Sequence, residues 1–328
     1  MKPNLFDYAT SELSQDAFLG WYLRWADESM DEDIELQISA RKFLIKYIQE
    51  QYPNYIHSIK TVEIKKQYNN IDLLVIVNNN LSIIIEDKTD TGTHSNQLQR
   101  YKDSISGDKV LLYIKTGNET ASKALQIVQK YNYSVIYRKN LLDFWLDCKS
   151  NNEIFTSFVK KMTEYENITN SYIQTPIEKW NRTQIQGFYM GIETEINKNG
   201  GKADWKYVAN PLGGVEVFVW NWRNTTDCAI YLQLENGTLC IKIGEIKSDK
   251  NATEIRWKYY KLVQEISKEM NLKIMKPRFH KGKYMTIGIV PNNFIYNSSE
   301  FSFEHVIVAF HKYEQLVDKC AAKIQLNN

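Results

Sequence analysis

Two short apolar segments separated by three asparagines constrain the fold of this chain more than any other feature. Residues 71–77 and 81–85 are rich in Ile, Val and Leu, and the asparagine triplet 78–80 lies between them. This pattern predicts a β-hairpin with a three-residue loop. Opposed residues then have numbers that sum to 158, so Asp72 lies opposite Glu86. Directly opposed residues share a face of the sheet, with Cβ atoms about 5 Å apart.

Charged side chains are expected to meet at one end of this hairpin. Lys88 returns to the face of Glu86 because side chains alternate along a strand. Burying two carboxylates and an ammonium is costly unless they have a task or a counter-ion. Carboxylate oxygens are the ligands that Mg²⁺ prefers, so Asp72 and Glu86 are candidate metal ligands, and the main-chain carbonyl of Asp87 is a further one. In a hydrolytic site, Lys88 would orient the attacking water or stabilise negative charge in the transition state.

A helix is expected to follow the hairpin at residues 93–106. Gly92 precedes it, and Thr93 and Ser95 are candidate N-caps. Gln97 and Tyr101 are four residues apart and therefore share a face of this helix. Gln97 could hydrogen-bond a water or a phosphate, and Tyr101 could do the same or pack. Two cations flank the same helix as candidate phosphate contacts, Arg100 and Lys102.

An amphipathic helix is predicted over residues 10–25, capped by Thr10. Its apolar stripe would consist of Leu13, Ala17, Phe18, Trp21 and Trp25. Glu12 lies in the first turn, where a carboxylate suits the helix dipole. Glu12 is either only that favourable N-terminal acid or a further carboxylate of the hairpin site, and Asp16, one turn later, is its competitor.

The order of these motifs resembles the PD-(D/E)XK nuclease superfamily. The resemblance rests on Asp72, then Glu86-Asp87-Lys88, then the QxxxY element of Gln97 and Tyr101, which is similar to the RecB-like branch. Residues 11–27 also resemble the opening helix of bacterial members. The similarity covers about the first 150 residues, and Ile71 stands where the family name has proline.

The resemblance implies both a fold and a chemistry. It implies a restriction-endonuclease-like mixed-sheet core with the order αβββαβ, and a glutamate on the first helix is part of the site in many members. It implies a Mg²⁺- or Mn²⁺-dependent phosphodiesterase that cuts nucleic acid, with DNA as the expected substrate, in bacterial restriction, repair or phage defence. The catalytic set would then be Asp72, Glu86, Lys88, Gln97, Glu12 and Tyr101.

The rest of the chain predicts an α/β protein of two domains. After the hairpin come a strand at 109–114, a helix at 119–131 and a strand at 134–137, which implies a parallel strand pair. A polar stretch near residue 166 marks the expected boundary between a nuclease-like domain, 1–165, and a second α/β (α+β) domain, 166–328. We expect antiparallel strands in the second domain at 205–208, 215–222, 228–234, 239–244, 272–275 and 285–290, and helices at 180–196, 253–270 and 303–323.

The tripeptide pattern Glu-x-Lys occurs three times, so the hairpin site has two rivals. The first, at 63–65, lacks an upstream strand that bears an aspartate and is typical of a solvated strand face. The third, at 245–247, follows Asp227 by one hairpin. However, the turn at Asn236-Gly237 places Asp227 and Glu245 on different faces. Residues 86–88 are therefore the favoured site.

A basic loop in the second half is a candidate nucleic-acid contact. Residues 276–284 interleave cations with aromatic side chains, a combination that suits phosphates and base stacking, although such a run also occurs as a solvated turn. Trp220, Trp222 and Trp257 are expected in the core. The candidate cations of the loop are Lys276, Arg278, Lys281 and Lys283.

Composition limits the remaining possibilities. Residues 1–165 carry 20 Lys and Arg against 22 Asp and Glu, whereas residues 166–328 carry 21 against 17, so phosphate attraction is more plausible in the second half. The sequence contains no run of 18 apolar residues, so it predicts no membrane span. The N-terminal sequence lacks the apolar core of a signal peptide, and the four cysteines show no metal-ligand spacing, so we expect a cytoplasmic protein with reduced thiols.

Two alternatives to a simple nuclease remain open at this point. The same scaffold could be a catalytically inactive nuclease fold that binds nucleic acid or acts as a sensing or interaction module. Alternatively, the second half could bind a small molecule or protein and gate the nuclease. A homodimer is also plausible, because cutting both strands of a duplex requires two sites.

Overall fold

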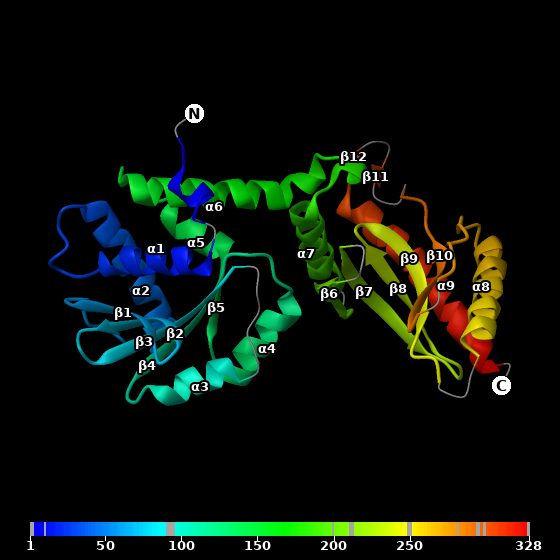
Figure 1. The fold of residues 1–328 in the computed structure, drawn as a ribbon, viewed down its shortest axis with the longest axis horizontal. Helices are drawn as coiled ribbons and strands as arrows, with labels where there is room; N and C mark the ends of the chain where they lie inside the picture. Colours follow the sequence, from blue (N-terminus) through cyan, green and yellow to red (C-terminus); the bar gives the residue numbers. More distant parts are fainter. Residues whose placement is uncertain are drawn as a thin grey trace. The chain divides into compact units, whose positions relative to one another are not determined.

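The computed structural model describes residues 3–9, 11–89, 96–198, 200–209, 213–247, 251–280, 282–292, 296–297 and 300–326. The chain divides into two compact units, residues 1–168 and 169–328 (Figure 1). The helix α6 (Glu153–Asn170) runs through this division and through the boundary expected from the sequence. Each unit is described by itself below.

The first unit is built on a mixed five-stranded sheet. Its strands follow one another in the order of the chain, β1-β2-β3-β4-β5. The first three form an antiparallel meander, and β3, β4 and β5 run parallel to one another. This arrangement confirms the mixed α/β sheet expected from the sequence. The bounds are β1 (Val62–Tyr68), β2 (Ile71–Val77), β3 (Leu81–Lys88), β4 (Lys109–Lys115) and β5 (Ser134–Tyr137).

Helices cover both faces of this sheet. The core on one face joins α1, α2, α5 and α6 to side chains such as Ile83 and Ile85. The core on the other face joins α3 and α4 to Ile84 and Leu111. Successive residues of β3 thus enter different cores, which is why the strand is apolar without interruption. The helices are η1 (Leu5–Asp7), α1 (Glu12–Arg24), α2 (Ile34–Gln51), α3 (Gln97–Ser104), α4 (Ala121–Tyr131) and α5 (Arg138–Trp145).

The hairpin register is the one that the asparagine triplet predicts. Leu73 pairs with Ile85 and Val77 with Leu81, so the numbers of opposed residues sum to 158. Asn78 and Asn79 have φ angles of 51° and 60°, a left-handed conformation that asparagine tolerates better than most residues. The Asn78 side chain accepts hydrogen bonds from the backbone N–H groups of residues 60 and 61, which fixes the loop beside the chain that enters β1.

The predicted apolar stripe of α1 is partly wrong. Leu13 is 66% exposed and Ala17 is also exposed, whereas Gln15 and Asp16 are buried. The helix therefore turns a mixed face toward the sheet, with two polar residues at its N-terminal end and Phe18 further along. The helix predicted over 93–106 is described only as α3, and the expected caps Thr10, Thr93 and Ser95 lie outside the described residues.

The second unit is built on an antiparallel five-stranded sheet of order β10-β9-β8-β7-β6. The hairpin turn at Asn236-Gly237 is confirmed, because Glu235 pairs with Thr238. The strand expected at 272–275 is wrong, because only an isolated bridge joins Met275 to Ile289. The strands are β6 (Ala203–Val208), β7 (Val215–Asn224), β8 (Ala229–Glu235), β9 (Thr238–Gly244), β10 (Tyr284–Ile289), β11 (Tyr296–Asn297) and β12 (Glu300–Phe301).

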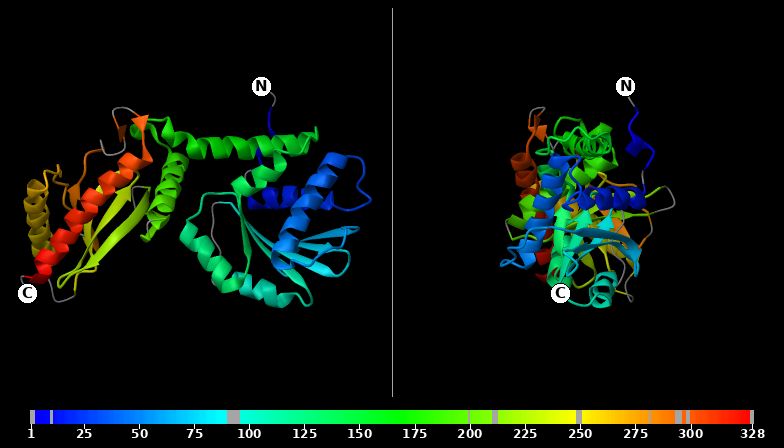
Figure 2. Two further views of the ribbon diagram at one scale, coloured as in Figure 1. Left: turned by 180° about the vertical axis from the view of Figure 1, so that it is seen from behind. Right: turned by 90° about the vertical axis from the view of Figure 1, so that its left-hand side faces the viewer.

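One face of this second sheet carries the core of the unit. Leu232, Ile241 and Phe218 pack there against residues of three helices. Figure 2 shows the last of these helices, in red, running across the sheet. No helix in the described parts of the chain is long and apolar enough to cross a membrane. The helices are η2 (Ser171–Ile173), η3 (Ile177–Lys179), α7 (Arg182–Lys198), α8 (Ala252–Glu269) and α9 (Phe303–Leu326).

A buried carboxylate fixes the end of α1 to the start of β1. Asp27 accepts hydrogen bonds from the Ser29 backbone and hydroxyl and, at 2.8 Å, from the backbone N–H of Val62, and it pairs with Arg24 at 2.5 Å. Burial alone would raise the pKa of Asp27, but these donors hold it well below its usual range. The folded state therefore stabilises the ionised Asp27 carboxylate more than the unfolded chain does.

We expect Asp27→Asn to lower the free energy of unfolding by about 1–3 kcal/mol at neutral pH, since it removes the charge that several donors stabilise. Because the folded pKa is depressed, the wild-type carboxylate stabilises the fold above the unfolded pKa of about 3.9, and this contribution is lost as pH falls further. Urea unfolding measured at pH 7 and pH 3 should show the gap between wild type and variant narrowing in acid. The exposed Asp147→Asn serves as the control, and an equal loss in both variants would contradict this assignment.

Candidate active site

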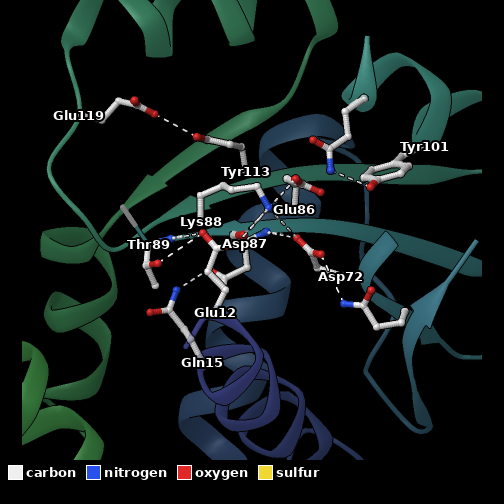
Figure 3. Close-up of polar contacts among 12 residues, drawn as sticks. Glu12, Gln15, Asp72, Glu86, Asp87, Lys88, Thr89, Tyr101, Tyr113 and Glu119 are labelled. Carbon is white, nitrogen blue, oxygen red and sulfur yellow. Dashed lines mark hydrogen bonds and ion pairs between the residues drawn. The ribbon is translucent and has the colours of Figure 1, made fainter. Parts of the chain in front are cut away.

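The ammonium of Lys88 lies between two carboxylates at the end of the central hairpin. Lys88 Nζ is 2.7 Å from Glu86 Oε1 and 3.2 Å from Asp72 Oδ2. Asp72 belongs to the start of β2 and the other two residues to the end of β3, so the hairpin register brings them together, as the sequence predicts (Figure 3). Asp72 Oδ2 also accepts a hydrogen bond of 3.0 Å from the backbone N–H of Asp87, which fixes it to the neighbouring strand.

Burial disfavours the ionised form of Glu86. Its side chain is fully buried, and apart from the Lys88 ion pair its oxygens have no hydrogen-bond partner among the described residues. Burial, then the charge of Asp72, raise the pKa of Glu86 to about 8. A divalent cation next to these oxygens would favour the ionised form. Additional positive charge beside Glu86 would therefore stabilise its ionised form.

Lys88 remains an ammonium in this environment. Burial alone would lower its pKa, but the hydrogen bond to Glu86 and the charges of Glu86, Asp72 and Glu12 raise it above the ordinary value. A lysine with a raised pKa holds its proton at neutral pH and is a poor general base. Lys88 can therefore orient groups by hydrogen bonding or stabilise negative charge, in agreement with the role predicted for it.

The first helix brings a third carboxylate to the site. Glu12 Oε1 accepts hydrogen bonds from the backbone N–H of Thr89 at 3.2 Å and from its hydroxyl at 3.3 Å, and Glu12 Oε2 is 3.9 Å from Lys88 Nζ. Glu12 also lies in the first turn of α1. Glu12 is therefore an acid in the first turn of its helix and also contacts the end of β3, so its position agrees with both interpretations made from the sequence.

Gln15 and Asp16 contact the opposite side of the same strand, and sequence reasoning did not place Gln15 in the site. The Asp87 side chain is fully buried on the α1 face, where Gln15 Nε2 donates to Asp87 Oδ1 at 2.5 Å. Gln15 Oε1 accepts from the Thr116 hydroxyl at 2.6 Å. Spacing of three and four residues from Phe18 and Leu19 is the sequence signal that could have identified both polar residues as buried.

Two acids share this inner layer. Burial, and next the charge of Asp72, raise the pKa of Asp16 to about 6. Burial, and next the charge of Asp16, also raise the pKa of Asp87 well above its usual value. The Asp87 main-chain oxygen, predicted as a metal ligand, accepts a hydrogen bond of 2.9 Å from Lys88 Nζ. Asp16 therefore packs behind the strand, while Glu12 contacts its end.

The glutamine and tyrosine of the QxxxY element contact one another on α3. Gln97 Nε2 donates to the Tyr101 hydroxyl at 2.7 Å, and Tyr101 is buried (Figure 3). Burial raises the pKa of Tyr101, and the charges of Glu86 and Asp72 raise it further. Arg100 is exposed, and Lys102 is half-buried with its carbonyl accepting a hydrogen bond from Lys109. The pair formed by Gln97 and Tyr101 thus lies within electrostatic range of the carboxylates.

Glu86 also has an aromatic neighbour on β4. Tyr113 pairs with Glu86 in the parallel register, and its hydroxyl donates to Glu119 Oε2 at 2.9 Å. Burial and the charge of Glu119 raise the pKa of Tyr113. Tyr113 therefore stays protonated and lies beside Glu86 on the neighbouring strand.

The donor chemistry of the site suits a hard divalent cation. All the candidate ligands are oxygens, and among the residues that the structure describes only Lys88 contacts the buried oxygens of Glu86 as a donor. Within the described ranges, no group of three His, Cys, Asp or Glu residues has the geometry of an assembled metal site. The arrangement fits a cation held by Asp72 and Glu86 together with water and substrate oxygens, rather than a closed protein cage.

The two rival Glu-x-Lys tripeptides lack these features. Glu63 pairs with Lys65 at 3.4 Å on a solvated part of β1. Glu245 is exposed. Asp227, its proposed partner, pairs instead with Lys258 of α8 at 2.8 Å.

The fold and the site define a class of protein. A mixed sheet in which an antiparallel meander leads into parallel strands, with Asp opposite Glu-x-Lys where the central strands end, is the framework of a nuclease. The family model described as the PD-(D/E)XK nuclease superfamily matches residues 3–186, more than half of the chain, and the chain belongs to this superfamily. Neither the curated proteins nor the solved structures gave a match.

We expect Gln15→Ala to lower the free energy of unfolding by about 1–3 kcal/mol, because it leaves the buried oxygens of Asp87 and Thr116 without their partner. Chemical denaturation of the purified protein measures this loss. Gln99→Ala is a matched control, since Gln99 donates to Asp103 on the exposed surface of α3, and its loss should change stability by no more than about 0.5 kcal/mol. Equal stability of the two variants would show that the Gln15 contact does not support the site.

Proposed function

We propose that this protein is a deoxyribonuclease that hydrolyses phosphodiester bonds with the help of Mg²⁺ or Mn²⁺. The observation that carries this proposal is the Lys88 ammonium held at 2.7 Å from Glu86 and 3.2 Å from Asp72. Membership of the nuclease superfamily supports nucleic acid as the substrate class. The choice of DNA, the metal and the RecB-like branch are parts of the proposal.

The carboxylates Asp72 and Glu86 would hold the cation, with Glu12 and the main-chain carbonyl of Asp87 as additional oxygen donors. When bound, such a cation supplies charge stabilisation for the phosphate and activates water. The chain itself contributes a lysine that keeps its proton and therefore directs a hydrogen bond at a water or at a phosphate oxygen. Gln97 would orient the same groups, with the Tyr101 hydroxyl as its partner.

Contacts to the substrate backbone would come from cations outside the carboxylate cluster. Arg100 and Lys102 on α3 are the candidates in the first unit. In the second unit Arg278 and Lys283 are exposed, and Lys281 lies outside the described residues.

The basic loop packs on α8 through an aromatic cluster of Trp257, Tyr260 and Phe279, which Lys276 contacts. Lys276 Nζ lies 5.1 Å from the ring centre of Trp257, 5.6 Å from that of Phe279 and 5.9 Å from that of Tyr260. The expectation that Trp257 lies in the core is wrong, because it is 38% exposed. A phosphate contact by Lys276 would therefore compete with these cation–π interactions.

The ion pairs of Lys88 also favour a second candidate function. A lysine that closes the gap between two carboxylates forms a stable cluster without any metal, as expected of an inactive nuclease fold that binds nucleic acid or senses a partner. Such a protein would bind nucleic acid equally well with and without divalent metal. The gating role of the second unit, the homodimer, the cytoplasmic location and a part in restriction, repair or phage defence stay predictions.

The proposal is tested by incubating the protein with labelled single-stranded DNA, duplex DNA and RNA in Mg²⁺, Mn²⁺ or a chelator. We expect metal-dependent cleavage of DNA that falls by about 10²-fold or more in Lys88→Ala and Asp72→Asn, since each change removes a group that acts on the developing charge. Lys65→Ala and Glu245→Gln alter the other two Glu-x-Lys tripeptides and should leave the rate unchanged. Cleavage that survives both site substitutions would refute the assignment, and selective cutting of RNA would correct the substrate.

Metal binding can be measured without activity. Saturating Mg²⁺ or Mn²⁺ at about 100 times its Kd stabilises the folded state by about 2.7 kcal/mol, which raises the melting temperature of a unit of this size by about 5–10 °C. We expect this shift in the wild type and in the control Glu63→Gln, and its loss in Asp72→Asn. A shift of the same size in Asp72→Asn would place the bound cation elsewhere.

A further inference from the structure

A single extra residue in β7 turns one tryptophan of the second unit away from the core. Trp220 pairs with Leu232, whereas Arg223 pairs with Ile230, so one residue is inserted between them, and Asn221 takes a φ of 50°. Such a bulge shifts the alternation of side chains along a strand. Trp220 therefore packs on Phe310 of α9 with ring centres 4.5 Å apart.

Trp222 lies on the other side of the sheet. Its indole stacks on Tyr231 of β8 with ring centres 4.2 Å apart and an interplanar angle of 19°. Tyr284 of β10 meets the same tyrosine edge-on at 6.5 Å. Trp222 is half-buried and Tyr284 is exposed, so the expectation that Trp222 belongs to the core is wrong. Aromatic side chains from three strands thus gather on the sheet face opposite the core.

These rings border a hollow of about 1110 Å³ in the second unit. Its lining includes aliphatic and polar residues of the sheet face opposite the core, among them Val217, Val219 and Gln233, and it extends to Trp220 and Phe310 on the side of α9. A pocket for a compact small molecule usually measures about 300–1,000 Å³, so this hollow has room for an extended ligand.

The charges around the hollow favour an anion. Three acids line it, Asp204, Glu235 and Glu314, and the four Lys and Arg residues of the lining outnumber them. Glu235 is paired with Lys242 and Glu314 with His311. Lys202 and Lys206 are exposed and form no ion pair with any residue that the structure describes. Together with the positive balance of residues 166–328, these two ammonium groups favour a ligand with spaced negative charges.

We propose that this hollow binds a short stretch of single-stranded nucleic acid, with a base stacked on Trp222 and a backbone phosphate near Lys206. Since Tyr231 covers one face of the indole, the base would stack on the opposite face. An antiparallel sheet that presents aromatic rings beside cations is a platform on which unpaired bases stack without sequence reading. This inference rests on the proposed nuclease function, because it gives the second unit the task of holding a single strand of the substrate.

The test measures binding in the presence of a chelator, so that cleavage plays no part. Fluorescence anisotropy of the full-length protein with a labelled strand of about ten nucleotides, a site size typical of such platforms, gives the Kd. We expect Trp222→Ala to weaken binding by about 5- to 100-fold, the loss of one base stack, and Trp222→Phe to restore part of it. Lys206→Glu should weaken binding and reduce its dependence on salt.

Matched controls separate the hollow from the rest of the unit. Tyr207→Ala removes an exposed aromatic residue of β6 that does not line the hollow, and Lys261→Glu reverses an exposed charge on α8. Both should bind as the wild type does, and thermal melts establish that every variant compared is folded. If Trp222→Phe binds the strand like the wild type while Trp222→Ala does not, binding requires an aromatic ring at this position, as the proposal expects.

Three results would overturn the inference. They are wild-type affinity in folded Trp222→Ala, duplex DNA that binds through Trp222 as tightly as the single strand, and a free mononucleotide that binds as tightly as the strand. Failure of this inference leaves metal-dependent cleavage intact. Conversely, binding through Trp222 in a protein that cleaves nothing would refute the nuclease proposal alone.

Discussion

The contact of Lys88 with Asp72 and Glu86 depends on one alignment of two strands, and most of the first unit serves to hold that alignment. A shift of one residue between β2 and β3 would move Asp72 to the other face, away from Lys88. The loop at 78–80 prevents the shift, because Asn78 and Asn79 adopt left-handed conformations and Asn78 is hydrogen-bonded to the chain before β1. The apolar cores on both faces oppose the shift as well, since every side chain of the shifted strand would change sides.

The tripeptide Glu86-Asp87-Lys88 joins the two layers of the unit. Lys88 contacts Asp72 and Glu86, and Asp87 contacts α1 through Gln15. Glu12 reaches the end of the same strand from one turn earlier on that helix. The position of α1 is therefore tied to the position of Lys88, and a substitution in either element would displace the other.

The sequence predicted the parts of the fold that local patterns control. The β2–β3 register follows from the asparagine triplet and the β8–β9 register from Asn236-Gly237, because a short loop determines which residues are opposed. The convergence of Asp72, Glu86 and Lys88 followed directly. Asp16 was considered only as a competitor of Glu12, and Gln15 was not placed in the site, because the aromatic residues of α1 suggested a different buried face. Trp222 was misplaced because a regular strand puts residues 220 and 222 on one face, and the bulge between β7 and β8 that separates them, with its left-handed Asn221, was not predicted.

The bulge at Asn221 has a consequence for how such a chain can change over evolutionary time. Deletion of Asn221 would restore the regular pleat and leave Trp222 opposite Tyr231, because Trp222 would then follow Trp220 directly and successive side chains of a strand alternate between faces. Straightening the strand without removing a residue would instead turn Trp222 to the face of Trp220. The aromatic surface would therefore survive loss of the extra residue, but not loss of the bulge in a strand of unchanged length.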